Sequence, residues 1–417
     1  MSEAPRVIRA VDSSSEEMVR FLRDLVRVPS VTGFETEAQE LVREKLRSLS
    51  AVVDYWKPRR SDFKGLEAFI DEERNVGTRP NVVGVIRGSG GRTLGFNGHI
   101  DVVPEGDRHS WSRRPFGGAV KGGRMYGRGT CDMKAGLVSM IFAVQAILES
   151  DAHLAGDVSL ASVIGEESGG LGTLACILRG HVPDGVIIGE PTSLRLVLAQ
   201  AGCLMFRLKI HGKQAHGASR YMGVSAVEKF FPVLNSLLAL EERRRALRSH
   251  PLFKEVPNPV TLSVGTVRAG NWDSTVPEEL VAEGRYGVWP GETLASAKSQ
   301  FVSALREATR ADPWLRRAPP ELSWFGPQWE PAEIPEGNWL AKLVSSASLR
   351  GLGVRPRPRG IAGGTDMRLY TNVARVPALV FGPGDDSMAH FSDESVDLDE
   401  MVRACKVYAL AALRPDE

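Results

Sequence analysis

The sequence predicts an α/β fold in which a mixed sheet is covered by helices and one inserted α+β domain interrupts the chain. Up to position 203, short apolar runs that end in glycine alternate with helical stretches, which is typical of a sheet with helices on both faces. From 204 to 326 the order changes to β-α-β-β-α-β, which indicates a ferredoxin-like domain. The first pattern resumes from 327 to 417, so we expect segments 1–203 and 327–417 to form one domain around the insertion.

The first segment contains the elements that an α/β domain requires. Residues 16–27 and 36–49 have apolar side chains at helical spacing, and the serine run 13–15 is a predicted N-cap for the first of these helices. Residues 59–80 are charged and lack periodicity, so we expect a long surface loop. An almost wholly apolar stretch, 135–148, is the predicted core helix. The predicted strands are 81–87, 93–97, 158–164 and 185–188.

The insertion and the last segment are justified in the same way. Alternating apolar and polar residues predict the strands of the insertion, and helical spacing predicts its helices. The strands are 204–211, 260–267, 280–288 and 321–325, and the helices are 225–238 and 293–310. After the proline-rich stretch 327–335 we expect a helix at 339–348, a strand at 378–381 and a closing helix at 398–413.

The composition is that of a globular protein, and its balanced charge favours a small substrate over a large charged partner. Hydrophobic residues make up 42% and charged residues 25% of the 417 residues. Because 52 basic and 51 acidic residues nearly cancel, the charge gives no reason to expect nucleic acid or an anionic membrane as partner. The first 15 residues lack the apolar core of a signal peptide, and we find no uncharged apolar run of about 18 residues that would span a membrane.

The cysteines indicate a reducing compartment. The four of them, Cys131, Cys176, Cys203 and Cys405, are widely spaced and form no Cys-x-x-Cys pair. Neither a disulfide framework nor a thiolate zinc site is therefore indicated, and we expect a cytoplasmic location.

Histidine and acidic residues follow the ends of several predicted strands. His99 and Asp101 follow strand 93–97, and Glu190 follows strand 185–188. In α/β sheets ligands bind beyond the carboxyl ends of strands, so we expect these side chains to converge. A lone histidine at a strand end is more often a structural hydrogen bonder. Together with carboxylates it favours a metal site, in which Asp101 would hold the second ring nitrogen of His99.

Further carboxylates strengthen the case for a cation. Asp132 lies in a glycine-rich turn before the apolar helix, where an N-cap is the alternative interpretation. Glu166 and Glu167 are adjacent carboxylates after strand 158–164, and they repel each other unless a nearby cation keeps both ionised. Asp132, Glu167 and Glu190 carry three negative charges. Glu166 adds a fourth, which two Zn²⁺ ions would neutralise.

These patches, in this order, resemble a family of dinuclear-zinc deacylases and exopeptidases that includes acetylornithine deacetylase, succinyl-diaminopimelate desuccinylase, aminoacylase and the bacterial glutamate carboxypeptidase. The resemblance runs from Val28-Pro29-Ser30 and Thr32-Gly33 to Ala389-His390. It implies a zinc-peptidase-like catalytic domain made of 1–203 and 327–417, and a lid domain, 204–326, that forms a homodimer. It also implies two Zn²⁺ ions per subunit, with Co²⁺ or Mn²⁺ as alternatives. The implied ligands are Asp132 bridging both ions, His99 and Glu190 on one ion, and Glu167 and His390 on the other.

The resemblance further implies catalytic roles. Glu166 is the expected general base, which takes a proton from an attacking water whose pKa the metals lower, and returns it to the leaving nitrogen. His216 matches a histidine that reaches across the dimer to stabilise the tetrahedral oxyanion. Taken alone, His216 is more typical of a turn between a strand and a helix. The peptide bond after Asp132 is expected to be cis.

The candidate substrate residues lie in two places. The run Gly363–Arg368 resembles a substrate-binding loop, in which Thr365 and Arg368 are the candidates. For Arg368 a surface ion pair is the alternative.

In the insertion the chain departs from the family pattern. Many relatives carry an asparagine and a carboxylate-gripping arginine where this chain has Ser274 and Gly287. Asn271 and Arg285 are the candidate replacements, since Arg285 points to the same strand face as Gly287.

Three functions remain open at this point. The first is a deacylase that removes an acyl group from the nitrogen of a small amine or amino acid, and the second is an exopeptidase or dipeptidase on the same centre. The third is a metal-dependent binding protein without turnover, which the presence of Glu166 disfavours. Glycine at 287 favours an N-acylated amine outside the usual set, such as a formylated aminopyrimidine, and Glu190 also favours deacylation.

Overall fold

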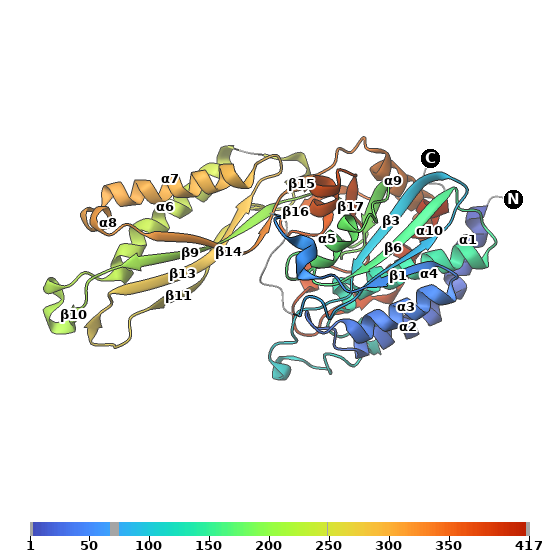
Figure 1. Cartoon of the computed structure of the whole chain (residues 1–417), viewed down its shortest axis with the longest axis horizontal. Helices are drawn as coiled ribbons and strands as arrows, with labels where there is room; N and C mark the ends of the chain where they lie inside the picture. The colour runs from blue at the N-terminus through green and yellow to red at the C-terminus, as the bar shows by residue number, and fades with distance from the viewer. Residues whose placement is uncertain (1–2, 67–74, 248, 414–417) are drawn as a thin grey trace. The chain divides into compact units, whose positions relative to one another are not determined.

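The computed structural model describes residues 3–66, 75–247 and 249–413, and it divides into two compact units (Figure 1). Unit 1 consists of Met1–Leu198, Ile334–Arg359 and Thr365–Glu417, and unit 2 consists of Ala199–Glu333 and Gly360–Gly364. The expected insertion, 204–326, lies inside unit 2. Unit 2 begins a few residues earlier and ends later than that insertion, and it also includes the short segment Gly360–Gly364.

Unit 1 is built on a mixed sheet with the strand order β1-β2-β6-β3-β7-β17-β8. The central strands β6, β3, β7 and β17 are parallel, whereas β1, β2 and β8 join antiparallel to their neighbours. The strands are β1 (Val52–Trp56), β2 (Asn81–Ile86), β6 (Gly156–Val163), β3 (Gly91–His99), β7 (Gly185–Ile188), β17 (Ala378–Val380) and β8 (Leu196–Gln200). Two short strands, β15 (Ala332–Glu333) and β16 (Pro358–Ile361), pair with β8.

Helices cover both faces of this sheet. Gln39 of α3 hydrogen-bonds to Ser162 of β6, whereas Cys176 of α5 packs with Ala161 and Val163 of the same strand. Because successive strand residues point to opposite faces, α3 and α5 lie on opposite sides of the sheet. The helices are α1 (Glu3–Ser13), α2 (Ser15–Arg27), α3 (Thr36–Ser48), α4 (Ala135–Glu149), α5 (Leu171–Leu178), α9 (Trp339–Leu352) and α10 (Leu398–Leu413).

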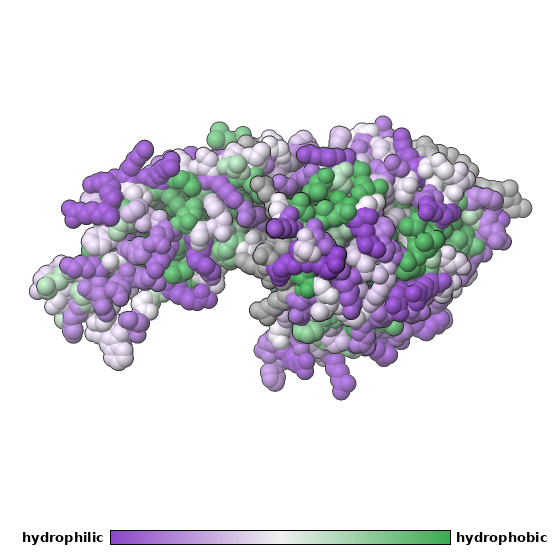
Figure 2. All heavy atoms as spheres, in the orientation of Figure 1, coloured by the Kyte–Doolittle hydropathy of each residue, from purple (hydrophilic) through white to green (hydrophobic). Residues whose placement is uncertain are grey.

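Helix α4 is the core helix of unit 1. Every side chain from Ala135 to Ile147 is buried, and α4 packs against α1, α2 and α10. By length and apolar composition the helical stretch Thr130–Glu149 would also suffice to cross a membrane, but 89% of its apolar window is buried inside the protein. Helix α3, by contrast, is amphipathic, and hydrophilic residues cover its outward face (Figure 2).

Several local predictions need correction. Ser14 of the serine run stands at the predicted N-cap position of α2, but it makes no side-chain cap bond, because its backbone is helical and its hydroxyl donates to the carbonyl oxygen of Ala10. Helix α1 itself was not predicted, since its mixed charge hides two buried valines. The expected loop 59–80 contains the short helical turn η1 (Arg60–Phe63), and its residues 67–74 lie outside the described ones. Strand β3 extends to His99, so this residue ends the strand instead of following it.

Unit 1 also contains a small second sheet and several short helical turns. A three-stranded sheet in the order β18-β5-β4 joins segments far apart in sequence. Its strands are β4 (Ala119–Lys121), β5 (Arg124–Tyr126) and β18 (Ser395–Asp397). Other short helical turns among the described residues of unit 1 are η2 (Arg108–Ser110), η3 (Thr130–Lys134), η6 (Leu369–Ala374) and η7 (Asp386–Met388). Unit 2 contains η4 (Gly217–Met222) and η5 (Pro251–Phe253).

Unit 2 has the ferredoxin-like topology that the sequence predicts. Its antiparallel sheet has the order β11-β13-β9-β14, and the chain follows the path β-α-β-β-α-β. The elements are β9 (Gly202–His211), α6 (Ala226–Leu247), β11 (Leu262–Ala269), β13 (Glu279–Val288), α7 (Leu294–Ala311), α8 (Pro313–Arg317) and β14 (Glu321–Trp329), with a small ribbon of β10 (Ala215–His216) and β12 (Thr275–Val276).

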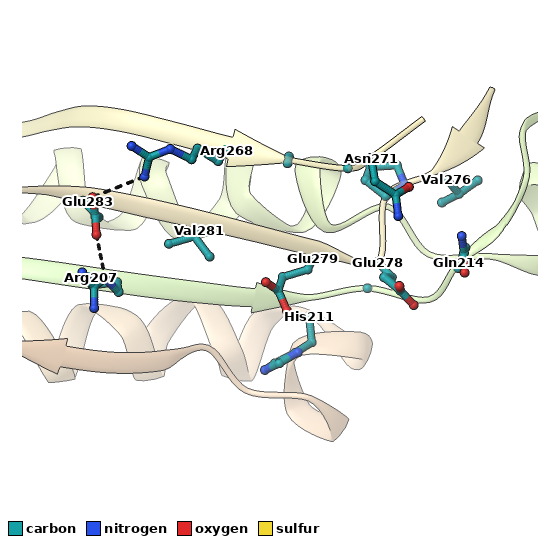
Figure 3. A pocket seen from close by; sticks show the side chains of 14 residues that line it. Arg207, His211, Gln214, Arg268, Asn271, Val276, Glu278, Glu279, Val281 and Glu283 are labelled. Carbon is teal, nitrogen blue, oxygen red and sulfur yellow. Dashed lines mark hydrogen bonds and ion pairs between the residues drawn. The ribbon is translucent and has the colours of Figure 1, made fainter. Parts of the chain in front are cut away.

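The two faces of the unit 2 sheet differ. Alternate residues such as Phe206, Leu208 and Ala282 point into a core shared with α6 and α7. On the other face the charged side chains of Arg207, Glu279 and Glu283 border an open hollow of about 840 Å³ together with Val281. There Glu283 accepts from Arg207 and pairs with Arg268 (Figure 3).

Candidate metal centre

His99 is held in one orientation at the end of β3. The side chain is buried, and its Nδ1 lies 2.8 Å from the main-chain carbonyl oxygen of Asp101. A carbonyl oxygen only accepts, so Nδ1 carries a proton and, in the neutral ring, Nε2 presents a lone pair. That nitrogen faces Asp132 Oδ1 at 3.0 Å and Glu190 Oε2 at 3.5 Å. A lone pair aimed at two carboxylates is repulsive unless a cation or a proton lies between them.

Asp101 therefore acts differently from the prediction. Its carboxylate is 3.6 Å from His99 Nδ1, farther than its main-chain carbonyl oxygen, which accepts from that nitrogen at 2.8 Å. The carboxylate instead accepts from the backbone N–H groups of Glu166, at 3.2 Å, and Glu167, at 3.3 Å. Thr32 Oγ1 donates to it at 3.1 Å. Asp101 thus fixes the turn that presents both glutamates after β6, a role that the sequence pattern did not indicate.

Asp132 lies between two histidines. Its Oδ1 faces His99, and its Oδ2 is 3.3 Å from His390 Nε2. The N-cap interpretation is wrong, because α4 begins at Ala135 with Lys134 in the cap position. The peptide bond Asp132–Met133 is cis, as expected from the resemblance.

His390 completes the group from the far end of the sequence. Its Nε2 also lies 3.0 Å from Glu167 Oε2. The contacts with Asp132 and Glu167 raise the pKa of His390 to about 10. The residue has a left-handed backbone (φ 66°), which is uncommon for a residue with a side chain.

Two sets of three side chains bring ligand atoms within 4.8 Å of one another. One set is His99, Asp132 and Glu167, and the other is His99, Glu166 and Glu190. His390 joins through its contacts with Asp132 and Glu167. All five predicted ligands and Glu166 therefore lie in one cluster at the ends of β3, β6 and β7 in unit 1.

The charges of this cluster fit divalent cations. Burial raises the pKa of Glu190 to about 8, and burial together with Asp132 raises that of Glu167. Burial, Glu190 and Asp366 raise the pKa of Glu166 well above its usual range. Carboxylates crowded in this way stay ionised only beside positive charge. Imidazole and carboxylate groups are the ligands that zinc and related ions prefer.

The predicted substrate-binding run Gly363–Arg368 contains buried residues that make structural contacts. Arg368 is only 2% exposed and donates from Nη2 to the carbonyl oxygen of Gly169 at 2.7 Å, so the surface ion-pair interpretation is wrong. Thr365 is also buried, and its hydroxyl accepts from the N–H of Met367. Between them, Asp366 accepts from Thr173 at 2.6 Å. Asp366 was not among the predicted site residues, although it stands inside the glycine-rich run.

The remaining predicted residues belong to unit 2. His216 is exposed on β10, and its Nδ1 accepts from the N–H of Ala218 at 3.1 Å. Asn271 borders the open hollow (Figure 3). Arg285 donates to the carbonyl oxygen of Ala362 at 3.3 Å, within the segment Gly360–Gly364.

Packing explains why position 287 is a glycine. A Cβ added there would lie 2.5 Å from the Cα of Val260, which is backbone and cannot yield as a flexible side chain would. The main chain of Gly287 is also engaged, because its carbonyl oxygen accepts from Arg244 Nη1 at 2.7 Å. An arginine at position 287 is therefore incompatible with the packing of this unit.

Comparison with known proteins places this cluster in a family. The model of peptidase family M20/M25/M40 matches residues 95–414, which include every ligand candidate. The chain belongs to peptidase family M20/M25/M40. As a member of this family it is a hydrolase that acts on amide bonds.

Curated relatives of this M20 chain are N-deacylases. It is 26% identical to the N-formyl-4-amino-5-aminomethyl-2-methylpyrimidine deformylase of Halalkalibacterium halodurans, and the match covers 97% of this chain and 96% of the relative. A match to the succinyl-diaminopimelate desuccinylase of Gluconacetobacter diazotrophicus is 29% identical and covers 96% and 97% of the two chains.

Solved structures show the same fold at lower identity. An M20 family metallo-carboxypeptidase of Sulfolobus solfataricus has a TM-score of 0.75 at 18% identity, with 95% of this chain and 99% of that chain covered. A dipeptidase of Saccharomyces cerevisiae has a TM-score of 0.75 at 17% identity and covers both chains fully. A Bacillus subtilis protein described as a dinuclear metal binding peptidase from the M20 family has a TM-score of 0.65 at 16% identity, with 96% and 98% covered.

Proposed function

We propose that this protein is a dinuclear zinc amidohydrolase that removes a formyl, acetyl or succinyl group from the nitrogen of a small N-acylated amine. The observation that supports it most strongly is the His99 lone pair aimed at Asp132 and Glu190. His99 and Glu190 would hold one ion, Glu167 and His390 the other, and Asp132 both. When bound, such ions lower the pKa of water and polarise a carbonyl oxygen.

Glu166 performs the proton transfers in this proposal. Its carboxylate takes a proton from the attacking water and returns it to the nitrogen of the departing amine, so that one amide C–N bond breaks and one C–O bond forms. Asp101 orients this group by accepting the backbone N–H of Glu166, while the contact between Arg368 and Gly169 holds the other end of the turn.

The substrate class follows from relatives and from Gly287. Two relatives are named as deformylases of an aminopyrimidine, at 26% identity. Because packing excludes a side chain at position 287, no arginine there grips a substrate carboxylate. We therefore infer an N-formyl amine without a carboxylate as the preferred substrate, with Thr365, Asn271 and Arg285 as candidate contacts. Exopeptidase activity is the second candidate, since solved structures with this fold are peptidases.

A substrate panel distinguishes these functions. With Zn²⁺ at saturation, we expect kcat/KM for an N-formyl aminomethylpyrimidine to exceed that of N-acetyl and N-succinyl amino acids by 10-fold or more, about 1.4 kcal/mol of transition-state binding. A dipeptide as the best substrate would favour the exopeptidase. No turnover of any amide at full zinc occupancy would favour a binding protein.

We further propose a homodimer in which His216 acts in the active site of the partner subunit. Since Nδ1 of His216 accepts a backbone N–H, its Nε2 carries the proton in the neutral ring and is a donor suited to an oxyanion. A cytoplasmic location is proposed too, supported by four buried, unpaired cysteines.

Mixing two inactive variants tests the dimer proposal. His216→Ala and Glu166→Ala each lose activity alone, but after subunit exchange at equal amounts one site in each mixed dimer has both residues. We expect recovery of about a quarter of wild-type activity, from random pairing in a two-fold dimer. A matched control mixes His216→Ala with the double variant, which restores no site. Equal activity in both mixtures would contradict action across the dimer.

A further inference from the structure

We propose that Arg128 and Glu394 form a buried pair that fixes the segments carrying Asp132 and His390 before any cation binds. The inference rests on the proposed metal site and deepens it, because it assigns two positioning residues that contact no substrate. Arg128 precedes Asp132 by four residues, and Glu394 follows His390 by four residues. The pair therefore joins the two chain segments that supply these ligands.

Glu394 holds the Asp132 segment through its carboxylate. The side chain is fully buried, and its Oε1 accepts from the N–H groups of Cys131 at 2.8 Å and Asp132 at 3.1 Å. Its Oε2 accepts from the N–H of Gly129 at 3.0 Å and from Arg128 Nη1 at 2.7 Å. Four donors occupy the four acceptor positions of one carboxylate. Glu394 is thus fully used as an acceptor, which suits a positioning residue and not a metal ligand.

Arg128 holds the His390 segment from the other side. Its Nη2 donates to the carbonyl oxygen of His390 and its Nη1 to that of Phe391, both at 3.2 Å. The guanidinium also lies over the ring of Trp111, 5.1 Å from its centroid. His390 and Asp393 both have left-handed backbones, at φ 66° and 59°, which residues with side chains adopt unfavourably. The bonds from Arg128 to the carbonyl oxygens of His390 and Phe391 help to hold this conformation.

The consequence is a site assembled in advance. Hydrogen bonds to the groups behind metal ligands orient those ligands, and their loss typically lowers metal affinity 10- to 100-fold. Here one ion pair orients both Asp132 and His390, so its loss separates two ligands at once. The effect should fall on cation affinity, while the chemistry of a fully loaded enzyme changes less.

Glu394→Gln tests this with Co²⁺ as the probe. The variant keeps the side-chain volume but places an NH₂ where N–H donors need an acceptor. We expect the metal-free protein to stay folded by circular dichroism, and the Co²⁺ dissociation constant, measured against a chromophoric chelator, to rise 10- to 100-fold. The visible spectrum of bound Co²⁺ should change as well. Saturating Co²⁺ should restore most of kcat.

The matched control is Glu242→Gln. The Glu242–Arg245 pair of helix α6 has a similar separation of 2.6 Å, but its two side chains are 62% and 52% exposed. We expect its loss to leave the Co²⁺ affinity unchanged. A second variant, Arg128→Lys, keeps the charge beside Glu394 but cannot bond two carbonyl oxygens in the same planar way, so it should also weaken Co²⁺ binding.

A measurement on the wild-type protein tests assembly without any substitution. The amides of Gly129, Cys131 and Asp132 should be as protected from hydrogen exchange in the metal-free protein as in the Co²⁺-loaded one. Unprotected amides in the metal-free protein, or wild-type Co²⁺ affinity in a folded Glu394→Gln or Arg128→Lys variant, would overturn this inference alone. Wild-type protein that binds no Co²⁺ would overturn it together with the proposed function.

Discussion

Glu166→Gln is expected to lower kcat by about 10²–10⁴-fold, the range for loss of a positioned general base. An amide cannot take the proton of the attacking water at neutral pH, whereas the side-chain volume and the hydrogen bond from its N–H to Asp101 remain. Because Glu166 is not among the five proposed ligands, the variant should bind two equivalents of zinc. Steady-state kinetics and metal analysis after dialysis measure the two properties separately.

The neighbouring residue supplies the control. Glu167→Gln changes the same functional group one position along, but Glu167 contacts His390 and is one of the five proposed ligands. This variant should lose metal affinity, and excess zinc should restore part of its rate. If the Glu166→Gln variant retains a tenth of wild-type activity, or if it loses zinc, Glu166 is not the general base.

Asp132→Ala is expected to abolish most of the stabilisation that zinc gives the wild-type protein. A ligand that binds the folded state alone stabilises it by about 4 kcal/mol when its concentration is a thousand times its Kd. Asp132 contacts both histidines, so its removal weakens both proposed ion positions at once. Thermal unfolding with and without zinc should show a large rise in Tm for the wild type and little for the variant.

An exposed aspartate is the comparison for this experiment. Asp399 lies in the first turn of α10, away from the cluster, and its replacement by alanine should change stability by only about 0.5 kcal/mol and leave the response to zinc intact. An undiminished zinc response in Asp132→Ala would show that the bound ions do not depend on this carboxylate, and the proposed bridging role would be wrong.

The sequence was most informative where periodicity and burial agree. Three strands of the split βαβ insertion and the closing helix Leu398–Leu413 were predicted with nearly correct bounds, because their apolar spacing reflects a core on one face. The fourth strand, predicted at 321–325, extends to Trp329. Helix α1 was missed because only Val7 and Val11 of its residues are buried, which leaves too little pattern to detect.

Within the site, the residues that take part were easier to predict than the contacts that each of them makes. His99 and Asp101 were recognised from their place at a strand end, yet the sequence assigned the Asp101 carboxylate to the wrong partner. The backbone carbonyl and the carboxylate of Asp101 compete for the same ring nitrogen of His99, two residues earlier, and only the fold decides which of them reaches it. The alternative of a surface ion pair for Arg368 failed for a similar reason, because burial depends on what packs over a loop.

The sequence by itself determined the ligand chemistry and the α/β architecture, since both depend on residue types and short-range spacing. The tertiary structure decided how those ligands are held, because long-range contacts span more than 260 positions of the chain. Glu394 accepts from the amides of Gly129, Cys131 and Asp132, and Arg128 donates to the carbonyl oxygen of His390. Such contacts leave no periodic trace in the sequence. They arise only when distant segments fold together and each buried donor must find an acceptor.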